Sequence, residues 1–171
     1  METERLVLRQ FQQSDLDVYA RMLADPELVR HLLPGGLPLG RVDAWRHLAM
    51  LAGNWQLRGF GHWAVEVKET GHFIGRVGLW YPEGWPDYEV GWTIDRDAWG
   101  HGYATEAARP ALHHAAHTLG VHHVISLILP ENVRSIRVAE KLGGRVEKRE
   151  VFQGRDTLFY TYGELSDREV P

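Results

Sequence analysis

The sequence lacks several features that would place it outside the cell or in a membrane. It has no cysteine, which excludes the disulfide framework of a small extracellular protein. No segment approaches the ~18 uncharged apolar residues of a membrane span. The first residues, METERLVLRQF, lack the apolar core of a secretory signal. We therefore expect a soluble, cytoplasmic protein with no membrane partner.

An excess of positive charge is also missing. Lys and Arg number 19 against 23 Asp and Glu, the formal net charge is −4, and there is no long basic run. Such a chain has no electrostatic field that would attract nucleic acid. Nucleic acid is therefore not an expected partner, and an anionic ligand would have to be bound by local geometry.

The length and composition are those of one globular domain. The 171 residues are 44% hydrophobic and 25% charged, and they contain no internal repeat, linker or low-complexity tract. We treat residues 1–171 as a single domain, with a polar tail from Glu164 that we expect to be frayed.

Changes in hydrophobic periodicity divide the chain into strands and helices. Helical spacing begins near Ser14, Asp43, Gly102 and Asn132, and strands are predicted at 5–11, 62–67, 71–81, 88–94, 124–129, 145–152 and 157–162. The apolar run at 124–129 indicates a central strand buried on both faces. The expected fold class is α/β (α+β): a mixed, mostly antiparallel central sheet flanked by about four helices. In the second helix we expect one inward face, formed by Trp45, Leu48, Ala49, Ala52 and Trp55.

Two glycines, Gly100 and Gly102, stand between an expected strand and an expected helix. Glycine lets a phosphate approach the main chain, and a helix N-terminus offers unpaired N–H groups and a partial positive charge. The turn is therefore a candidate anion site. A tight strand-to-helix turn without a ligand is the commoner explanation of a bare G-x-G.

The residues around these glycines resemble the acyl-CoA loop of the GNAT N-acetyltransferases, in the branch of ribosomal-protein N-terminal (Rim-type) acetyltransferases. The matching strings are WGHGYATEA at 99–107, YEVGW at 88–92 and NVRSIRVAEKLGGR at 132–145. The resemblance spans residues 5–163. It implies a single GNAT domain whose sheet opens beside acetyl-CoA, or another short acyl-CoA, as co-substrate.

The resemblance also implies which residues hold the co-substrate. Loop N–H groups would bind the pyrophosphate, backbone groups on the fourth strand would meet the pantetheine and thioester, and Asn132 would steady the pantetheine arm. The implied ligands are Thr93, Ile94, Arg96, Trp99, Gly100, His101, Gly102, Tyr103, Ala104 and Asn132. Two positions depart from the family pattern: Asp97 stands where many relatives have Gln or Arg, and Ala139 where many have a tyrosine general acid.

Two residues are candidates for the chemistry of acyl transfer to an amine. Glu89 would take the ammonium proton, directly or through water, and Ser135 would return a proton to the thiolate. Without the resemblance, a solvent-facing strand residue is the commoner interpretation of Glu89, and Ser135 is also consistent with a helix cap. A peptide α-amine of pKa ~8 is partly neutral at pH 7 whereas lysine is not, which favours a peptide N-terminus or a small amine as acceptor. A homodimer is left open.

Tryptophan is abundant, with seven residues. Trp80 and Trp85 flank a turn beside Glu89 and are candidates for the wall of an acceptor pocket. For the others, packing between helix and sheet is the expectation, namely for Trp45, Trp55 and Trp63.

Other functions are weaker alternatives. His113 and His117 have the i, i+4 spacing of a zinc site, but no glutamate base lies between them and no third ligand is evident, so we expect no metal. A nucleotide-phosphate binder would need a Walker lysine after its glycines, which is missing. A non-catalytic CoA-binding module of the same fold is the main alternative to an enzyme.

Overall fold

The computed structural model describes residues 1–32 and 34–163, so the expected fraying from Glu164 lies outside the described residues. The chain forms one sheet in the order β1-β2-β3-β4-β5-β7-β6. The strands are β1 (Leu6–Arg9), β2 (His62–Val67), β3 (His72–Trp80), β4 (Glu89–Ile94), β5 (Ile125–Ile128), β6 (Arg145–Phe152) and β7 (Arg155–Thr161). Each lies within a few residues of a predicted strand, and β5 is central, as its apolar run predicted.

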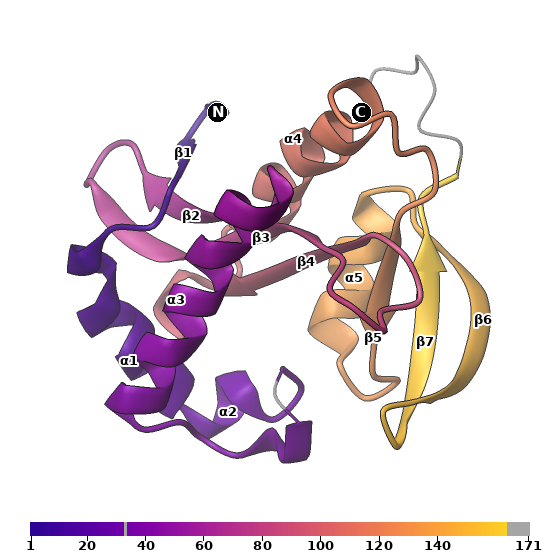
Figure 1. Cartoon of the computed structure of the whole chain (residues 1–171), viewed down its shortest axis with the longest axis horizontal. Helices are drawn as coiled ribbons and strands as arrows, with labels where there is room; N and C mark the ends of the chain where they lie inside the picture. The colour runs from indigo at the N-terminus through magenta and orange to yellow at the C-terminus, as the bar shows by residue number, and fades with distance from the viewer. Residues whose placement is uncertain (33, 164–171) are drawn as a thin grey trace.

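Five α-helices flank the sheet in the part of the chain that the structure describes: α1 (Leu16–Ala24), α2 (Pro26–Val29), α3 (Arg41–Arg58), α4 (Tyr103–His117) and α5 (Val133–Lys141). The expectation of about four helices missed α2. The pair Asp25–Pro26 ends α1 but also begins α2, because the Asp25 side chain accepts a hydrogen bond from the Glu27 N–H and Pro26 occupies the first helical position. Figure 1 shows α1, α2 and α3 together, and α5 beside the β5–β7–β6 part of the sheet.

The sheet is mixed and mostly antiparallel, which confirms the expected fold class. The one parallel pairing in the described chain joins β4 to β5, and it consists of a single residue pair, Glu89 with Ile125. Beyond this pair β4 continues to Ile94 while β5 diverges from it. The sheet is therefore open between β4 and β5, along the stretch of β4 where the co-substrate was expected.

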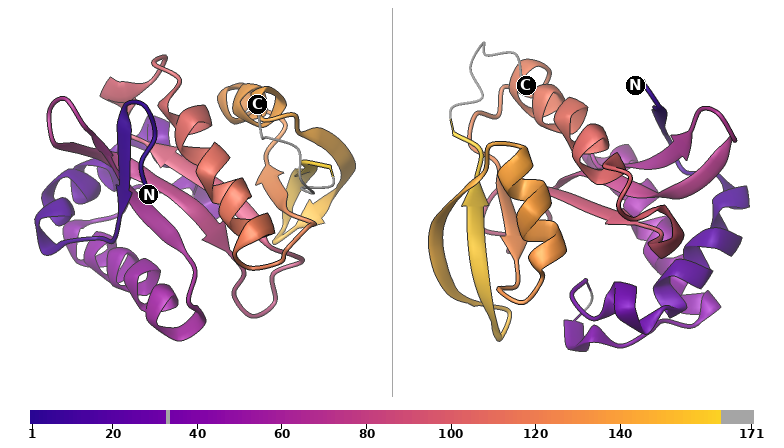
Figure 2. Two further views of the ribbon diagram at one scale, coloured as in Figure 1. Left: turned by 90° about the horizontal axis from the view of Figure 1, so that it is seen from above. Right: turned by 180° about the vertical axis from the view of Figure 1, so that it is seen from behind.

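Alternation along the strands assigns side chains to two faces. Val90 and Ile94 of β4 join the core cluster that contains α4, whereas Ala64 of β2 packs with α1 and α3. Because side chains alternate along β4, Glu89, Gly91 and Thr93 lie on the other face of the sheet, which α1 and α3 cover. The further views in Figure 2 show α3 and α4 on opposite sides of the sheet.

The inward face of α3 differs from the prediction. Its buried residues are Ala44, Leu48, Leu51 and Asn54, whereas the Trp45 side chain is 50% exposed. Trp45 lies one position beyond the buried Ala44, and this rotates it about 100° around the helix axis, away from the sheet. The packing expectation was therefore wrong for Trp45. It holds for Trp55 and Trp63, whose rings meet edge to face at 5.0 Å.

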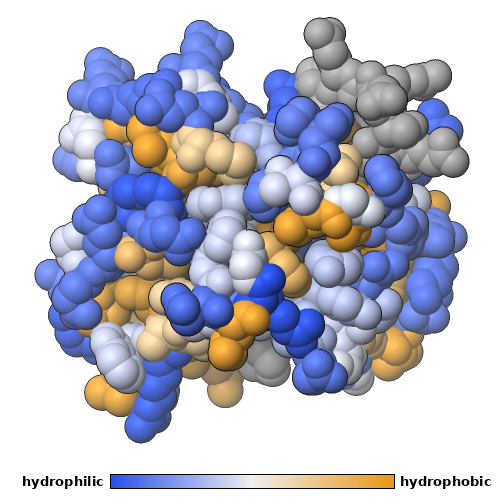
Figure 3. Space-filling model, turned by 45° about the horizontal axis from the view of Figure 1, so that its top comes forward, coloured by the Kyte–Doolittle hydropathy of each residue, from blue (hydrophilic) through white to orange (hydrophobic). Residues whose placement is uncertain are grey.

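Hydrophilic residues cover most of the face in Figure 3, with separate hydrophobic areas between them. No helix in residues 1–32 and 34–163 is both long and apolar enough to cross a membrane.

Candidate active site

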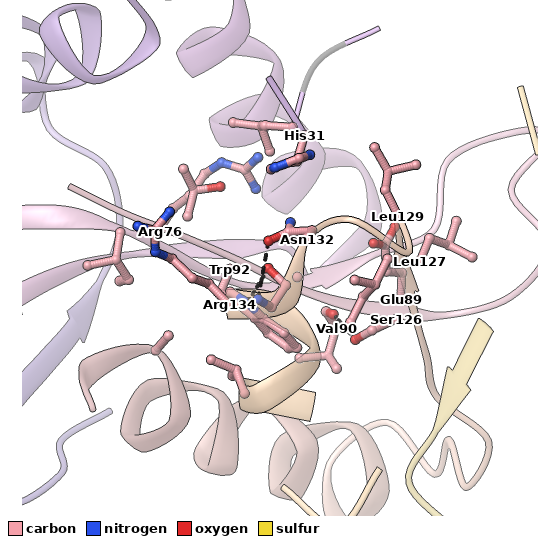
Figure 4. Close-up of a pocket in the computed structure, with 18 of the residues that line it drawn as sticks. His31, Arg76, Glu89, Val90, Trp92, Ser126, Leu127, Leu129, Asn132 and Arg134 are labelled. Carbon is pink, nitrogen blue, oxygen red and sulfur yellow. Dashed lines mark hydrogen bonds between the residues drawn. The ribbon is translucent and has the colours of Figure 1, made fainter. Parts of the chain in front are cut away.

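A cavity of about 940 Å³ opens at the separation of β4 from β5. It is bounded by β3 and β4, by the loop and first turn of α4, by α5, and by residues of α2 and α3. Most of the buried polar residues in the described chain line this cavity, namely His62, Arg76, Thr93, Thr105, Ser126 and Thr157. Figure 4 draws lining residues from both halves of the sheet around the opening. Buried polar groups require partners, so their gathering here indicates a site for a polar ligand.

The loop before α4 presents backbone N–H groups without partners. Gly100 and Gly102 have φ angles of +83° and +81°, which favour glycine. Within residues 1–32 and 34–163, the N–H groups of residues 100–105 form no hydrogen bond, and the first intrahelical bond runs from the Glu106 N–H to the Gly102 carbonyl. The Trp99 N–H, one of the loop donors that the resemblance implies, is instead bonded to the Arg96 carbonyl at 3.1 Å. The donor row therefore begins at Gly100.

The loop is held in place by side chains that the sequence pattern did not reveal. The Arg5 guanidinium pairs with the Glu106 carboxylate at 2.6 Å and also donates to the His101 carbonyl at 3.0 Å. The Trp99 indole donates to the Ile94 carbonyl at 2.7 Å. The Arg134 guanidinium lies over the Trp99 ring at 4.4 Å. These contacts fix the loop to the residue before β1, to β4 and to α5.

The register of β4 decides which of its N–H groups face the opening. The Asp95 N–H donates to Ile74 of β3, and successive N–H groups on a strand point to opposite sides. The N–H groups of Trp92 and Ile94 therefore point away from β3, toward the gap before β5. The backbone of Thr93 pairs with Arg76 instead, so Thr93 reaches the cavity through its hydroxyl. The expectation that Thr93 offers backbone groups to the co-substrate needs this correction.

Glu89 lies at the point where β4 and β5 separate. Its carboxylate accepts a hydrogen bond from the Trp85 indole N–H at 2.7 Å. Burial raises the pKa of Glu89 to about 7, against the opposing effects of the Trp85 and Leu127 N–H groups and the Arg76 guanidinium. A carboxyl group with this pKa exchanges protons near neutral pH, as a general base requires.

Ser135 and Asn132 enter the cavity from the start of α5. The Asn132 side chain, not Ser135, caps the helix by accepting from the Ser135 N–H at 3.2 Å. The Ser135 hydroxyl accepts a hydrogen bond from the Trp92 indole at 3.3 Å. Because an accepted bond leaves the hydroxyl proton available, Ser135 is able to donate to a ligand atom.

The cavity brings together all the predicted site residues except Arg96 and His101. Arg96 lies 3.5 Å from the Asp25 carboxylate, and the exposed His101 ring stacks on Tyr103. Asp97, the departure from the family pattern, is 83% exposed and faces Arg21. Its negative charge is therefore directed away from the cavity.

Several cationic or polar lining residues were missed. Arg76 and His62 face the cavity from β3 and β2, and Arg137 and Lys141 from α5. Arg76 alternates with apolar neighbours as a solvent-facing strand residue would, so nothing in the local sequence distinguishes it. Trp80 and Trp85, by contrast, line the cavity as expected for an acceptor wall.

The histidine pair on α4 lies elsewhere. The rings of His113 and His117 stack with centroids 3.9 Å apart. In the described part of the chain no group of three or more His, Asp or Glu side chains is arranged to hold a metal ion.

Comparison with known proteins agrees with this geometry. Residues 5–145 match the family described as "Acetyltransferase (GNAT) domain". The chain belongs to the GNAT acetyltransferase family. Among relatives of this GNAT protein, the uncharacterized N-acetyltransferase p20 of Bacillus licheniformis is 28% identical over 147 residues, which are 85% of this chain and 82% of p20.

Solved structures show the same GNAT fold. An acetyltransferase from Agrobacterium tumefaciens superposes with a TM-score of 0.85 at 30% identity, covering 96% of this chain and 94% of that one. RimL, a ribosomal α-N-protein acetyltransferase solved in complex with coenzyme A, has a TM-score of 0.79 at 16% identity over 96% of this chain and 97% of its own. The latter likeness shows the fold alone.

Proposed function

We propose that this protein transfers the acetyl group, or another short acyl group, of an acyl-CoA to a primary amine by direct attack of the amine on the thioester. Membership of the GNAT family supports the reaction class. The unpaired N–H groups from Gly100 to Thr105 fit a pyrophosphate, and the cavity is large enough for the pantetheine arm and an acceptor. The acceptor is a peptide N-terminus or a small-molecule amine.

The amine reaches the site as an ammonium ion and must lose a proton before it attacks. Glu89 takes this proton, directly or through a water molecule. The Trp85 indole orients the carboxylate by its hydrogen bond at 2.7 Å. Because the pKa of Glu89 is about 7, the carboxylate is both present and basic enough at neutral pH.

The neutral nitrogen then forms a bond to the thioester carbon, and the carbonyl oxygen becomes negatively charged. The N–H groups of Trp92 and Ile94, which point into the opening, are the nearby donors for this oxyanion. The oxyanion re-forms the carbonyl as the carbon–sulfur bond breaks, and the thiolate takes a proton from the Ser135 hydroxyl. The nitrogen gives up its second proton, which returns through water to the Ser135 oxygen. The products are an amide and a free thiol.

One observation carries the proposal. A carboxyl group with a pKa of about 7 and a row of unpaired N–H groups at a helix start line the same cavity. The first is a base suited to an amine, and the second is an anion site suited to a diphosphate. A module that only bound the coenzyme would not need a base.

The test measures thiol release from acetyl-CoA with a panel of small amines and short peptides. Glu89→Gln should lower kcat at pH 7 by ~10²–10⁴-fold, the usual contribution of a general base. Ser135→Ala should lower kcat by about tenfold, as expected for one lost hydrogen bond to the leaving group. The KM for acetyl-CoA should change little in either variant, because neither side chain is needed for the loop contacts.

Matched controls are Glu140→Gln and Ser14→Ala, both exposed and outside the cavity, which should keep full activity. Binding of acetyl-CoA without thiol release for any acceptor would support the non-catalytic module and refute transfer. Full activity of both Glu89→Gln and Ser135→Ala across pH would refute the residue assignments while leaving the reaction intact.

A further inference from the structure

Arg76 is a buried cation without a counterion. Its side chain is 7% exposed and lines the cavity, and its Nε has no hydrogen-bond partner. Among residues 1–32 and 34–163, no carboxylate oxygen lies within 4.0 Å of its guanidinium. The Arg9 guanidinium, by contrast, pairs with the buried Asp15 carboxylate at 2.7 Å. A buried charge left unpaired is strongly destabilising, so a partner of opposite charge from outside the chain is the physical expectation.

The groups that surround Arg76 do not supply this negative charge. Its Nη1 lies 3.0 and 3.1 Å from the two ring nitrogens of His62. Burial, together with the Arg76 charge, lowers the pKa of His62 well below its usual value and that of His47 to about 3, so both rings are neutral at pH 7. The Tyr19 hydroxyl, also adjacent, has a raised pKa because of its burial and stays neutral too. The Glu89 carboxyl interacts with Arg76 from across the site, but it is needed for the amine.

A second unpaired polar group adjoins Arg76. Thr93 is its direct cross-strand partner, so the two side chains stand on the same face of the sheet. Thr93 is 6% exposed, and its hydroxyl has no hydrogen-bond partner in the described chain. A guanidinium and a hydroxyl side by side match the two oxygens of a carboxylate.

The face of the sheet between this pair and Glu89 carries no side chain from β3 or β4. Gly78 and Gly91 lie between them on β3 and β4 and contribute no side chain to the face. A Cβ placed on Gly91 would lie 3.4 Å from the His62 ring and 3.9 Å from the Glu89 carboxylate, so one imidazole separates the base from the guanidinium. Figure 4 shows Arg76 and Glu89 as walls of the same cavity.

We propose that the acceptor is a small amine that also carries a carboxylate, in the manner of a free amino acid, and that Arg76 and Thr93 bind this carboxylate while Glu89 receives the proton of the amine. The inference rests on the proposed acyl transfer and specifies its acceptor class. A polyamine would place a second positive charge beside the buried guanidinium, and an internal peptide bond would offer no negative charge to it. Arg76 is thus a residue that determines specificity.

The experiment compares free amino acids with their carboxamides, which keep the amine and side chain but lose the negative charge. For the wild-type protein we expect kcat/KM to be at least 50-fold higher for each acid than for its amide, with spermidine a poor acceptor. Arg76→Met should reduce this ratio to near one and leave the KM for acetyl-CoA within twofold. Arg76→Lys, which retains the charge, should keep a preference for the acid.

Arg109→Met is the matched control, because the Nε of Arg109 is also buried without a partner but the residue does not line the cavity. It should keep the wild-type ratio. Equal kcat/KM values for acids and amides with the wild-type protein, or an unchanged acid-to-amide ratio in Arg76→Met, would overturn the inference. Either result would leave the proposed acyl transfer intact. If Arg76→Met does not fold, the wild-type ratio and Arg76→Lys still decide.

Calorimetric binding separates this inference from the proposed function. A free amino acid should bind the wild-type protein saturated with coenzyme A, and at least 20-fold more weakly the Arg76→Met variant. Binding that depends on Arg76, without turnover of any amine, would support the carboxylate site and refute catalysis. Turnover of amides and acids alike would support catalysis and refute the carboxylate site.

Discussion

Replacing Glu89 by Gln should stabilise the protein while it removes the base. In the unfolded chain the carboxyl has a pKa near 4.5, and in the folded protein burial raises it to about 7. Between these values the folded state holds more protons than the unfolded state, so its stability falls as pH rises. A shift of about 2.5 pKa units corresponds to about 3 kcal/mol, and this loss is complete above pH 7. Gln has the same shape, is never charged, and still accepts from the Trp85 indole.

The measurement is urea unfolding of both proteins at several pH values between 5 and 8.5. The variant should exceed the wild type by less than about 1 kcal/mol at pH 5 and by about 3 kcal/mol at pH 8. Glu69→Gln, in the exposed turn between β2 and β3, should show no such difference. If the two unfolding midpoints of Glu89→Gln and wild type stay equal at pH 8, the carboxyl is not desolvated, and the reasoning that makes it a base near neutral pH fails.

Three further results are expected. The wild-type kcat/KM should rise with pH up to about 7, as the Glu89 carboxyl loses its proton, and this limb should be lost in Glu89→Gln; a flat wild-type profile would contradict the assignment. Gly102→Ala should fold at a cost of ~1–2 kcal/mol, because a φ of +81° strains Ala although its Cβ would meet nothing closer than 3.7 Å. This variant should raise the Kd for acetyl-CoA at least tenfold. The control Gly71→Ala, which is strained alike at +66° but distant from the cavity, should leave the Kd unchanged. Arg5→Gln should speed amide hydrogen exchange of Glu106, whose N–H makes the first bond of α4 to the Gly102 carbonyl, since it removes the Arg5 bond to the His101 carbonyl, and it should raise the KM for acetyl-CoA a few-fold. Unchanged exchange would show that the loop holds its shape unaided.

The strands and most helices were predictable because local periodicity sets them. The strand order was not, since nothing near β7 in the sequence shows that it inserts between β5 and β6. The inward face of α3 was misjudged because Trp45 is large and apolar, and the fold buries the small Ala44 instead, where α3 approaches the sheet.

The candidate site divides in the same way. Glu89, Ser135 and the glycines were proposed because each belongs to a short continuous motif that resembles a known family. Arg76 was not, because a charged residue in an alternating strand normally faces solvent, and its burial depends on α1 and α3, which come from much earlier in the chain. Arg96 and His101 stand beside lining residues in the sequence, but their side chains are exposed outside the cavity.

The single residue pair that joins β4 to β5 has a mechanical consequence. The unit formed by β5, β6, β7 and α5 is hydrogen-bonded to the rest of the sheet over a short stretch only. An extended ligand lying in the gap could therefore bond to the backbone groups that β4 and β5 leave unpaired. Coenzyme binding should then hold the two parts of the sheet together, and the melting temperature should rise with the coenzyme concentration as mass action requires. The β5 amides that face the gap should exchange more slowly when it is filled.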